Sequence, residues 1–355
     1  MKKMAVRVLG VVMAISIMAG CGANASNSSA ETDSDETVRS EAVQSEATDK
    51  EKEFKGGTDA PGKTSGGGNG MGLQGGTASQ TENSDEIQVV IDENSDKFEQ
   101  FTYTDETSGI ALGYSLYIPD NYDENTEYPL VMYIPDSTCV GKTAEEIVEQ
   151  YYGANVWVTD EDQEKHGCFV FVPAFTEVVV DDNFTVSEQV DVVVRLLNQL
   201  IEDYSIDTDR LYTTGQSMGC MVSLYLNSLY PDFFAASLYV SGQWDISTLG
   251  NLENQKFFYI VAGGDEKASA GQDSVMEMFD DDQVPYSYAE WNAQNDSDTQ
   301  NSDAGELISQ NLNANMIRFE TGSVLTDASG KEHMESFNYA YDISVVRDWV
   351  FEQSR

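Results

Sequence analysis

The chain has 355 residues, of which 62 are acidic and only 19 are lysine or arginine, so its formal net charge is -43. A chain this acidic repels phosphate groups, which excludes nucleic acid and anionic lipid head groups as partners. It has four cysteines and two histidines, too few of the usual ligands for a zinc site. We therefore expect neither a metal nor another cofactor.

The N-terminus has the pattern of a bacterial lipoprotein signal. Two lysines precede a short apolar run from Val8 to Met18, and small residues then lead to Cys21. The pattern predicts a signal peptide at 1–20 and a lipid on Cys21, which anchors the exported protein to the cell membrane. An ordinary secretory signal that is cleaved elsewhere is the alternative, and it leaves the protein exported as well.

Two regions of different composition follow the signal. Residues 21–85 are rich in Ser, Thr, Asn, Glu and Gly, and they contain too little apolar surface to form a core. They are expected to form a flexible tether without chemistry of its own. Residues 86–355 have the length of one domain with a substantial core.

The first half of this domain contains four segments with the alternating or apolar pattern of strands. They are 98–103, 110–118, 129–134 and 168–173. The first two are separated by a short turn with a glycine and predict an antiparallel hairpin. The other two are continuously apolar and predict strands that are buried on both faces. An amphipathic helix is expected at 187–204.

The segment 215–219 reads Gly-x-Ser-x-Gly and lies between a strand pattern at 210–214 and a helix pattern at 220–226. A strand, a tight turn and a helix are the context of a nucleophile elbow, in which the central residue, here Ser217, stands at the top of a sheet. The turn is so closely packed that a side chain at either glycine would clash. Ser217 is therefore the predicted nucleophile.

Further strands are expected at 237–241, 257–261 and 316–319, with a closing helix at 343–353. Strands that alternate with helices predict an α/β protein with a mostly parallel sheet, helices on both faces, and ligands at the carboxyl ends of the strands. The polar stretch 296–303 is interpreted as a solvated insertion. A calcium loop is the alternative, but the stretch lacks the glycine of an EF-hand loop.

On such a sheet the members of a catalytic triad follow the order serine, acid, histidine. His333, expected in the loop after the last strand, is the one histidine downstream of Ser217 and is the predicted general base. Asp265 follows two glycines at the end of the penultimate strand and is the predicted acid. Glu266 beside it and Asp245 after the preceding strand are the alternatives.

An oxyanion hole requires two converging backbone N–H groups. One is predicted at Met218, directly after the nucleophile, and the other at Ser137 in the loop after the strand at 129–134. Thr138 in the same loop is the alternative for the second donor. Trp244 is predicted to line a substrate pocket, and a role as a lid over the core is its alternative.

Three cysteines besides Cys21 lie in the domain: Cys139, Cys168 and Cys220. They permit one disulfide and one free thiol, and the sequence does not select the pair. Cys220 directly follows the elbow and is expected to be buried as a small apolar residue.

Several segments together resemble the secreted α/β-hydrolases of the predicted-peptidase and polyhydroxybutyrate-depolymerase-like (feruloyl) esterase group. They are Tyr212–Gly219, Tyr230–Pro231, Phe234–Ser237, Gly242–Asp245, Gly264–Ala268, His333, Tyr341 and Val346–Trp349. The resemblance implies an α/β-hydrolase fold with a triad of Ser217, Asp265 and His333. One departure is Pro135–Asp136, where many relatives have His-Gly before the oxyanion loop.

The expected function is that of a surface-anchored serine hydrolase. The leading hypothesis is a carboxylesterase that acts through an acyl-enzyme on small-molecule or polysaccharide-linked esters. A serine peptidase of the prolyl-oligopeptidase-like type would use the same triad and is one alternative. A catalytically silent binding lipoprotein that retains the fold is the other.

Overall fold

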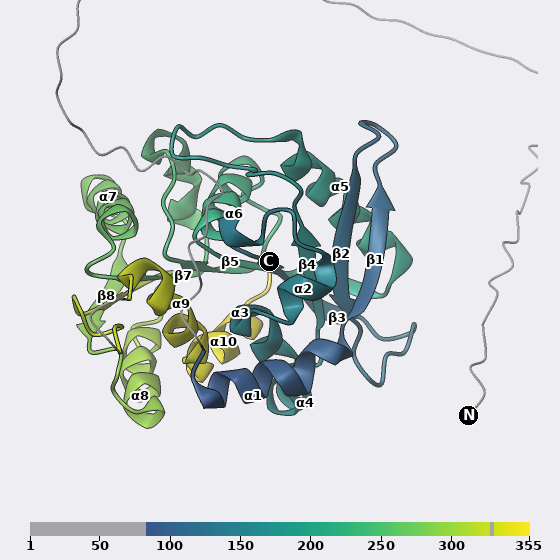
Figure 1. Ribbon diagram of the computed structural model, residues 1–355. Coiled ribbons are helices and arrows are strands. Elements are labelled where there is room, and N and C mark those ends of the chain that lie inside the picture. The colour runs from purple at the N-terminus through teal and green to yellow at the C-terminus, as the bar shows by residue number, and fades with distance from the viewer. Residues whose placement is uncertain (1–82, 327–329) are drawn as a thin grey trace, which may run out of the picture. The chain divides into compact units, whose positions relative to one another are not determined.

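The computed structural model describes residues 83–326 and 330–355 of the chain. The predicted signal peptide, the lipidation site Cys21 and nearly all of the predicted tether lie outside these residues. The described part contains one nine-stranded sheet between two layers of helices (Figure 1). The strand order is β1-β2-β4-β3-β5-β6-β7-β9-β8, so neighbouring strands are often far apart in sequence.

The strands are β1 (Glu99–Thr104), β2 (Ala111–Tyr117), β3 (Tyr128–Ile134), β4 (Phe169–Ala174), β5 (Ile206–Gln216), β6 (Ala236–Val240), β7 (Phe257–Ala262), β8 (Tyr286–Trp291) and β9 (Ala314–Phe319). The α-helices are α1 (Asp85–Asn94), α2 (Ala144–Val148), α3 (Tyr152–Asn155), α4 (Asp160–His166), α5 (Glu188–Asp203), α6 (Met218–Leu229), α7 (Glu266–Asp282), α8 (Ser297–Ile308), α9 (Glu332–Asp342) and α10 (Ser344–Phe351). Short 3-10 helices are η1 (Ser95–Lys97), η2 (Ser137–Cys139), η3 (Val156–Val158) and η4 (Ile246–Asn254).

The sheet has the mixed, mostly parallel character that the sequence predicts. β1 and β2 form an antiparallel hairpin, and β2 also pairs antiparallel with β4. All further pairs in the sheet are parallel. The predicted fold class, including the N-terminal hairpin, is therefore confirmed.

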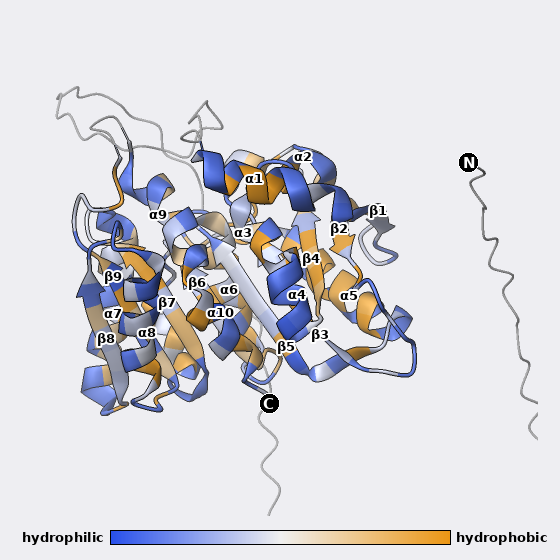
Figure 2. Ribbon diagram, turned by 90° about the horizontal axis from the view of Figure 1, so that it is seen from below, coloured by the Kyte–Doolittle hydropathy of each residue, from blue (hydrophilic) through white to orange (hydrophobic). Residues whose placement is uncertain are grey.

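Two apolar cores lie on the two faces of the sheet. One contains buried side chains of α5, α6 and α7, such as Leu196, Leu224 and Phe279. The other contains side chains of α1, α9 and α10, such as Ile91 and Tyr341. Strands such as β4 and β7 are hydrophobic along their length, whereas β5 is more polar, and surface helices such as α4 are largely hydrophilic (Figure 2). Continuous apolar strands are expected where helices cover both faces of a parallel sheet.

The structure corrects the interpretation of the stretch 296–303 as an insertion. These residues begin α8, because Asp296 caps the helix by accepting the N–H of Thr299 at 2.8 Å. The first turn of α8 is polar, which is typical of a solvated segment, but Ala304 and Leu307 in the following turns are buried. β8, which the sequence analysis missed, precedes α8 and forms the edge of the sheet.

The described domain also begins with a helix that the sequence analysis did not predict. Ser84 caps α1, and Ile91 in the middle of the helix is buried. The helix therefore begins slightly before the predicted domain boundary at 86. Among the described residues, no helix has the length and apolar character needed to cross a membrane.

Candidate active site

The turn between β5 and α6 has the strained geometry of an elbow. Ser217, which joins the two, has φ 51° and ψ -115°, a conformation that costs a non-glycine residue about 1–3 kcal/mol. A Cβ at Gly219 would lie 1.9 Å from the carbonyl oxygen of Ile134, and one at Gly215 would lie 2.4 Å from the backbone of Gly219. Both positions therefore require glycine, as the sequence analysis expected.

Ser217, His333 and Asp265 lie in one hydrogen-bonded chain. The Nε2 atom of His333 lies 2.8 Å from Ser217 Oγ, and its Nδ1 atom lies 2.5 Å from Asp265 Oδ2. Ser217 follows the end of β5, Asp265 follows β7, and His333 lies at the start of α9. The structure thus brings together the three residues that were predicted to form a triad, although β8 and α8 intervene between the acid and the histidine.

His333 is on a helix rather than in the expected loop, in the first turn of α9. Its imidazole packs edge-on against Phe337, one turn further along the helix, with ring centroids 5.3 Å apart. A helix fixes the direction of the ring more firmly than a loop, so this difference favours a defined orientation toward Ser217.

Asp265 is the acid that contacts the histidine, and its carboxylate is itself held in place. It is 8% exposed and caps α7, accepting the N–H of Ala268 with the oxygen that does not face His333. Glu266, the first alternative, is exposed in the first turn of α7. Asp245, the second alternative, instead caps η4.

Glu332 connects the segment that precedes Asp265 to the start of α9, which carries His333. The sequence analysis did not identify this residue. Its carboxylate accepts the N–H of Gly264 at 2.9 Å and that of Gly322 at 3.0 Å. Gly264 directly precedes Asp265, and Glu332 directly precedes His333, so one side chain couples the two positions. The glycines after β7 and β9 were visible in the sequence, but their shared partner was not.

The loop after β3 contains both candidates for the second oxyanion donor. The N–H of Thr138 donates to Asp136 Oδ1 at 2.8 Å and is therefore engaged. This leaves the N–H of Ser137 as the better candidate beside that of Met218, which begins α6 at its unpaired N-terminal end. Ser137 and Met218 both line the cavity that contains Ser217.

That cavity has a volume of about 360 Å³, at the small end of the range for ligand sites. One part of its wall is apolar, and the other part is polar or charged. The apolar residues are Val180, Met218, Met221 and Met334, and the others include Asp182, Gln243, Lys267 and Lys331. Methionine side chains are flexible and polarisable, so such a wall adapts to ligands of different shape.

The structure does not bring Trp244 to this cavity. The indole is 7% exposed and packs against Phe184 and Tyr225, with ring centroids 5.2 and 5.5 Å away. This is the alternative role as a lid over the core. The neighbouring Gln243 lines the cavity instead.

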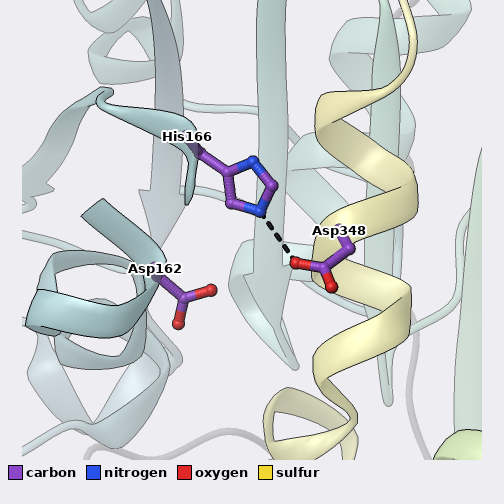
Figure 3. A group of neighbouring side chains, drawn as sticks. All are labelled: Asp162, His166 and Asp348. Atoms are coloured by element: carbon purple, nitrogen blue, oxygen red, sulfur yellow. Dashed lines mark hydrogen bonds and ion pairs between the residues drawn. The ribbon is translucent and has the colours of Figure 1, made fainter. Parts of the chain in front are cut away.

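The other histidine, His166, takes part in an ion-pair cluster between α4 and α10. Its Nε2 atom lies 2.8 Å from Asp348 Oδ1, with Asp162 close by (Figure 3). These three side chains have metal-ligand spacing. However, Arg347 binds both oxygens of Asp162, at 2.9 and 3.3 Å, so that carboxylate already has a cationic partner. The cluster therefore needs no metal to balance its charge.

The three cysteines of the described residues are free and buried. Burial raises the pKa of the Cys168 thiol to about 12 and that of Cys139 and Cys220 further. Their thiolates are therefore scarce at neutral pH, and they have no role in the candidate site.

No protein-family model matches the chain, and no curated protein sequence does. Among solved structures, it is similar to a thermostable esterase, with a TM-score of 0.56 and 23% identity over 74% of this chain. The chain spans 64% of the length of that esterase. It is also similar to a feruloyl esterase module from Clostridium thermocellum complexed with sinapinate, with a TM-score of 0.48, 13% identity and coverage of 75% of this chain and 92% of the module. The likeness to the thermostable esterase shows the α/β-hydrolase fold that the sequence resemblance implied.

Proposed function

We propose that the protein is a serine hydrolase of the carboxylesterase type. The observation that supports this most directly is the chain of hydrogen bonds from Ser217 through His333 to Asp265 at the wall of a cavity. In this mechanism His333 takes the proton of Ser217 as the hydroxyl attacks the ester carbonyl, and Asp265 stabilises the imidazolium. The alcohol leaves with a proton from His333, and an acyl-enzyme remains on Ser217.

Water completes the cycle. His333 removes a proton from a water molecule, the hydroxide attacks the acyl-enzyme, and Ser217 departs with the proton returned by His333. The N–H groups of Met218 and Ser137 stabilise the oxyanion that forms in both half-reactions. The acyl group lies against the methionines of the cavity wall.

The proposed substrates are neutral esters of short or aromatic acids, either small molecules or esters on polysaccharides. The small cavity and its adaptable apolar wall suit an acetyl or a feruloyl group. A panel of acetyl esters, feruloyl esters and peptide anilides, each tested with wild type and Ser217→Ala, checks the proposal. We expect ester cleavage that depends on Ser217 and is faster than peptide cleavage at equal concentration.

Two other outcomes of the same panel are informative. Efficient peptide cleavage with esters nearly untouched would assign a peptidase. No turnover of any substrate, together with no labelling of Ser217 by a fluorophosphonate probe, would assign a catalytically silent binding protein, because only an activated serine labels efficiently.

We also propose that the enzyme acts at the cell surface, anchored through a lipid on Cys21. The lipoprotein pattern of residues 1–21 supports this location. The Cys21→Ser variant should lose the lipid and leave the membrane fraction. Unchanged membrane association of that variant would contradict the anchor.

A further inference from the structure

Asp136 is a buried carboxylate that the proposed mechanism does not use. It is 1% exposed and lies between the end of β3 and Ser137. Within the described part of the chain it forms no ion pair, and hydrogen bonds satisfy it instead. Asp136 Oδ1 accepts the N–H of Thr138 at 2.8 Å and its hydroxyl at 2.6 Å. A buried charge without a cationic partner is unfavourable unless hydrogen bonds compensate it, so these bonds hold the carboxylate in one orientation.

The other carboxylate oxygen links Asp136 to the nucleophile elbow. Asp136 Oδ2 accepts a hydrogen bond from Gln216 Nε2 at 2.8 Å, and Gln216 directly precedes Ser217. The remaining end of this amide, Oε1, accepts the hydroxyl of Tyr133 at 3.0 Å. Both Gln216 and Tyr133 are buried. The amide of Gln216 is therefore fixed at both ends, with its donor toward the loop after β3.

This link extends the pairing of β3 and β5 beyond their backbone. The backbone register of the two strands ends at Ile134 and Gly215, two residues before Asp136 and one before Gln216. The chains then diverge into the loop that carries the N–H of Ser137 and the elbow that carries the N–H of Met218. The hydrogen bond between Asp136 and Gln216 connects these two segments beyond the last paired residues of the strands.

We propose that Asp136 and Gln216 are positioning residues that set the spacing between the two N–H groups of the oxyanion hole. The inference rests on the proposed esterase function. Asp136 holds the N–H of Thr138, so that the N–H of Ser137 is left for the substrate oxygen, and Gln216 ties this loop to the elbow. Oxyanion donors act only within about 2.7–3.1 Å of the developing charge, so a small displacement of the loop reduces turnover.

The first test removes either end of the link. Asp136→Ala and Gln216→Ala should each lower kcat for an activated acetyl ester by about 10- to 100-fold, because a displaced donor stabilises the transition state less. KM should change less than threefold, because the apolar part of the cavity wall, formed by Val180, Met221 and Met334, is untouched. Gln300→Ala is the matched control: Gln300 is a buried glutamine on α8 whose amide donates to two backbone carbonyls, of Ala293 and Asn295. It should lower the melting temperature and leave kcat unchanged.

The second test exchanges the donor and the acceptor. Gln216→Glu alone removes the N–H donor to Asp136 and brings two carboxyl groups together, so its kcat should fall at least tenfold below that of the wild type. The double variant Asp136→Asn with Gln216→Glu restores the link with reversed polarity, because the asparagine amide can donate to the new carboxylate while its oxygen still accepts from Thr138. At pH 8 the double variant should exceed the Gln216→Glu single variant in kcat by at least tenfold.

The results separate the inference from the function on which it rests. If the wild type cleaves esters but the alanine variants retain its kcat, or the double variant is no better than Gln216→Glu, the positioning role is wrong. If the alanine variants do not fold, the comparison of Gln216→Glu with the double variant tests the inference, because these substitutions preserve the volume of both side chains. A wild type that cleaves no ester contradicts the proposed function and this inference with it.

Discussion

At the residue scale, the candidate site is a set of side chains that are each held by a second group. His333 contacts Ser217 with one ring nitrogen and Asp265 with the other, and Asp265 is held by its own helix cap. Glu332, next to His333, accepts the backbone N–H groups of Gly264, next to Asp265, and of Gly322. Turnover should therefore respond to these residues as a unit.

The first prediction concerns that unit. Ser217→Ala and His333→Ala should each lower kcat by on the order of 10⁴- to 10⁶-fold, because neither residue can activate the ester alone. The double variant should lose little more than either single variant. Steady-state hydrolysis of an activated ester checks this, and losses that multiply in the double variant would count against a triad.

The second prediction distinguishes Asp265 from its neighbour. Asp265→Asn should retain the fold but lower kcat by about 10⁴-fold, since an amide neither holds the required tautomer of His333 nor stabilises its imidazolium. Glu266→Gln is the matched control, because this exposed side chain begins the same helix and should change kcat less than twofold. The reverse ranking would show that the acid is Glu266.

At the scale of elements, ion pairs attach helices and the hairpin to the rest of the domain. Arg347 of α10 binds Asp162 of α4, and both are more than 90% buried. Arg195 of α5 binds Asp105, which follows β1, at 2.7 and 3.0 Å. These contacts lie outside the candidate site, so they should affect stability without a direct effect on turnover.

The third prediction concerns the buried ion pair between Asp162 of α4 and Arg347 of α10. Asp162→Ala leaves the buried guanidinium of Arg347 without its partner and should lower the free energy of unfolding by about 3–5 kcal/mol. Asp160→Ala is the matched control on the same helix, because Asp160 is almost fully exposed and forms an ion pair with Lys97 at the surface. It should change the free energy of unfolding far less than Asp162→Ala does, because an exposed ion pair contributes little. Urea unfolding of the two variants measures the difference, and equal losses would contradict the role of burial.

The fourth prediction concerns the pH dependence of stability. Hydrogen bonds from Arg195 and Ser108 hold the pKa of Asp105 well below its usual value near 4. Because the pKa of Asp105 is lower in the folded state than in the unfolded state, its carboxylate stabilises the fold at pH values above the unfolded-state pKa. This contribution to the free energy of unfolding is lost as the pH falls toward the folded-state pKa. Between pH 4 and pH 2, wild-type stability should therefore fall more steeply than that of Asp105→Asn. Parallel pH profiles from urea unfolding would contradict it.

At the scale of the whole molecule, the fifth prediction concerns where the functional domain begins. A chain that starts at Asn83 keeps Ser84, the cap of α1, and should match the full chain in ester turnover and melting temperature. A chain that starts at Ser95 lacks Ile91, whose burial is worth about 1.5–3 kcal/mol, and should melt earlier. Loss of turnover in the chain from Asn83 would mean that preceding residues contribute to the site.

Features that depend on neighbouring residues could be predicted from the sequence. Gly215–Gly219 between a strand and a helix predicts a strained elbow at Ser217, because the strand, the tight turn and the helix are all local patterns. The order of Ser217, Asp265 and His333 along the chain, with few alternatives, indicated which groups to test. The alternating and apolar segments predicted the mixed sheet, since their periods report which faces are buried.

Contacts between distant groups depend on the fold and could not be predicted from the sequence. The sequence favoured Asp265 over the adjacent Glu266, and the contact with His333 selects it. The hydrogen bond from Gly264 to Glu332 keeps the segment after β7 beside the start of α9. Glu332 and the link between Asp136 and Gln216 join residues 68 and 80 positions apart. No local pattern records such a contact, because hydrogen bonds between strand ends depend on the order of strands in the sheet. Trp244 shows the same limit: its aromatic character was evident, but only the packing of Phe184 and Tyr225 around it put it in the core rather than the cavity.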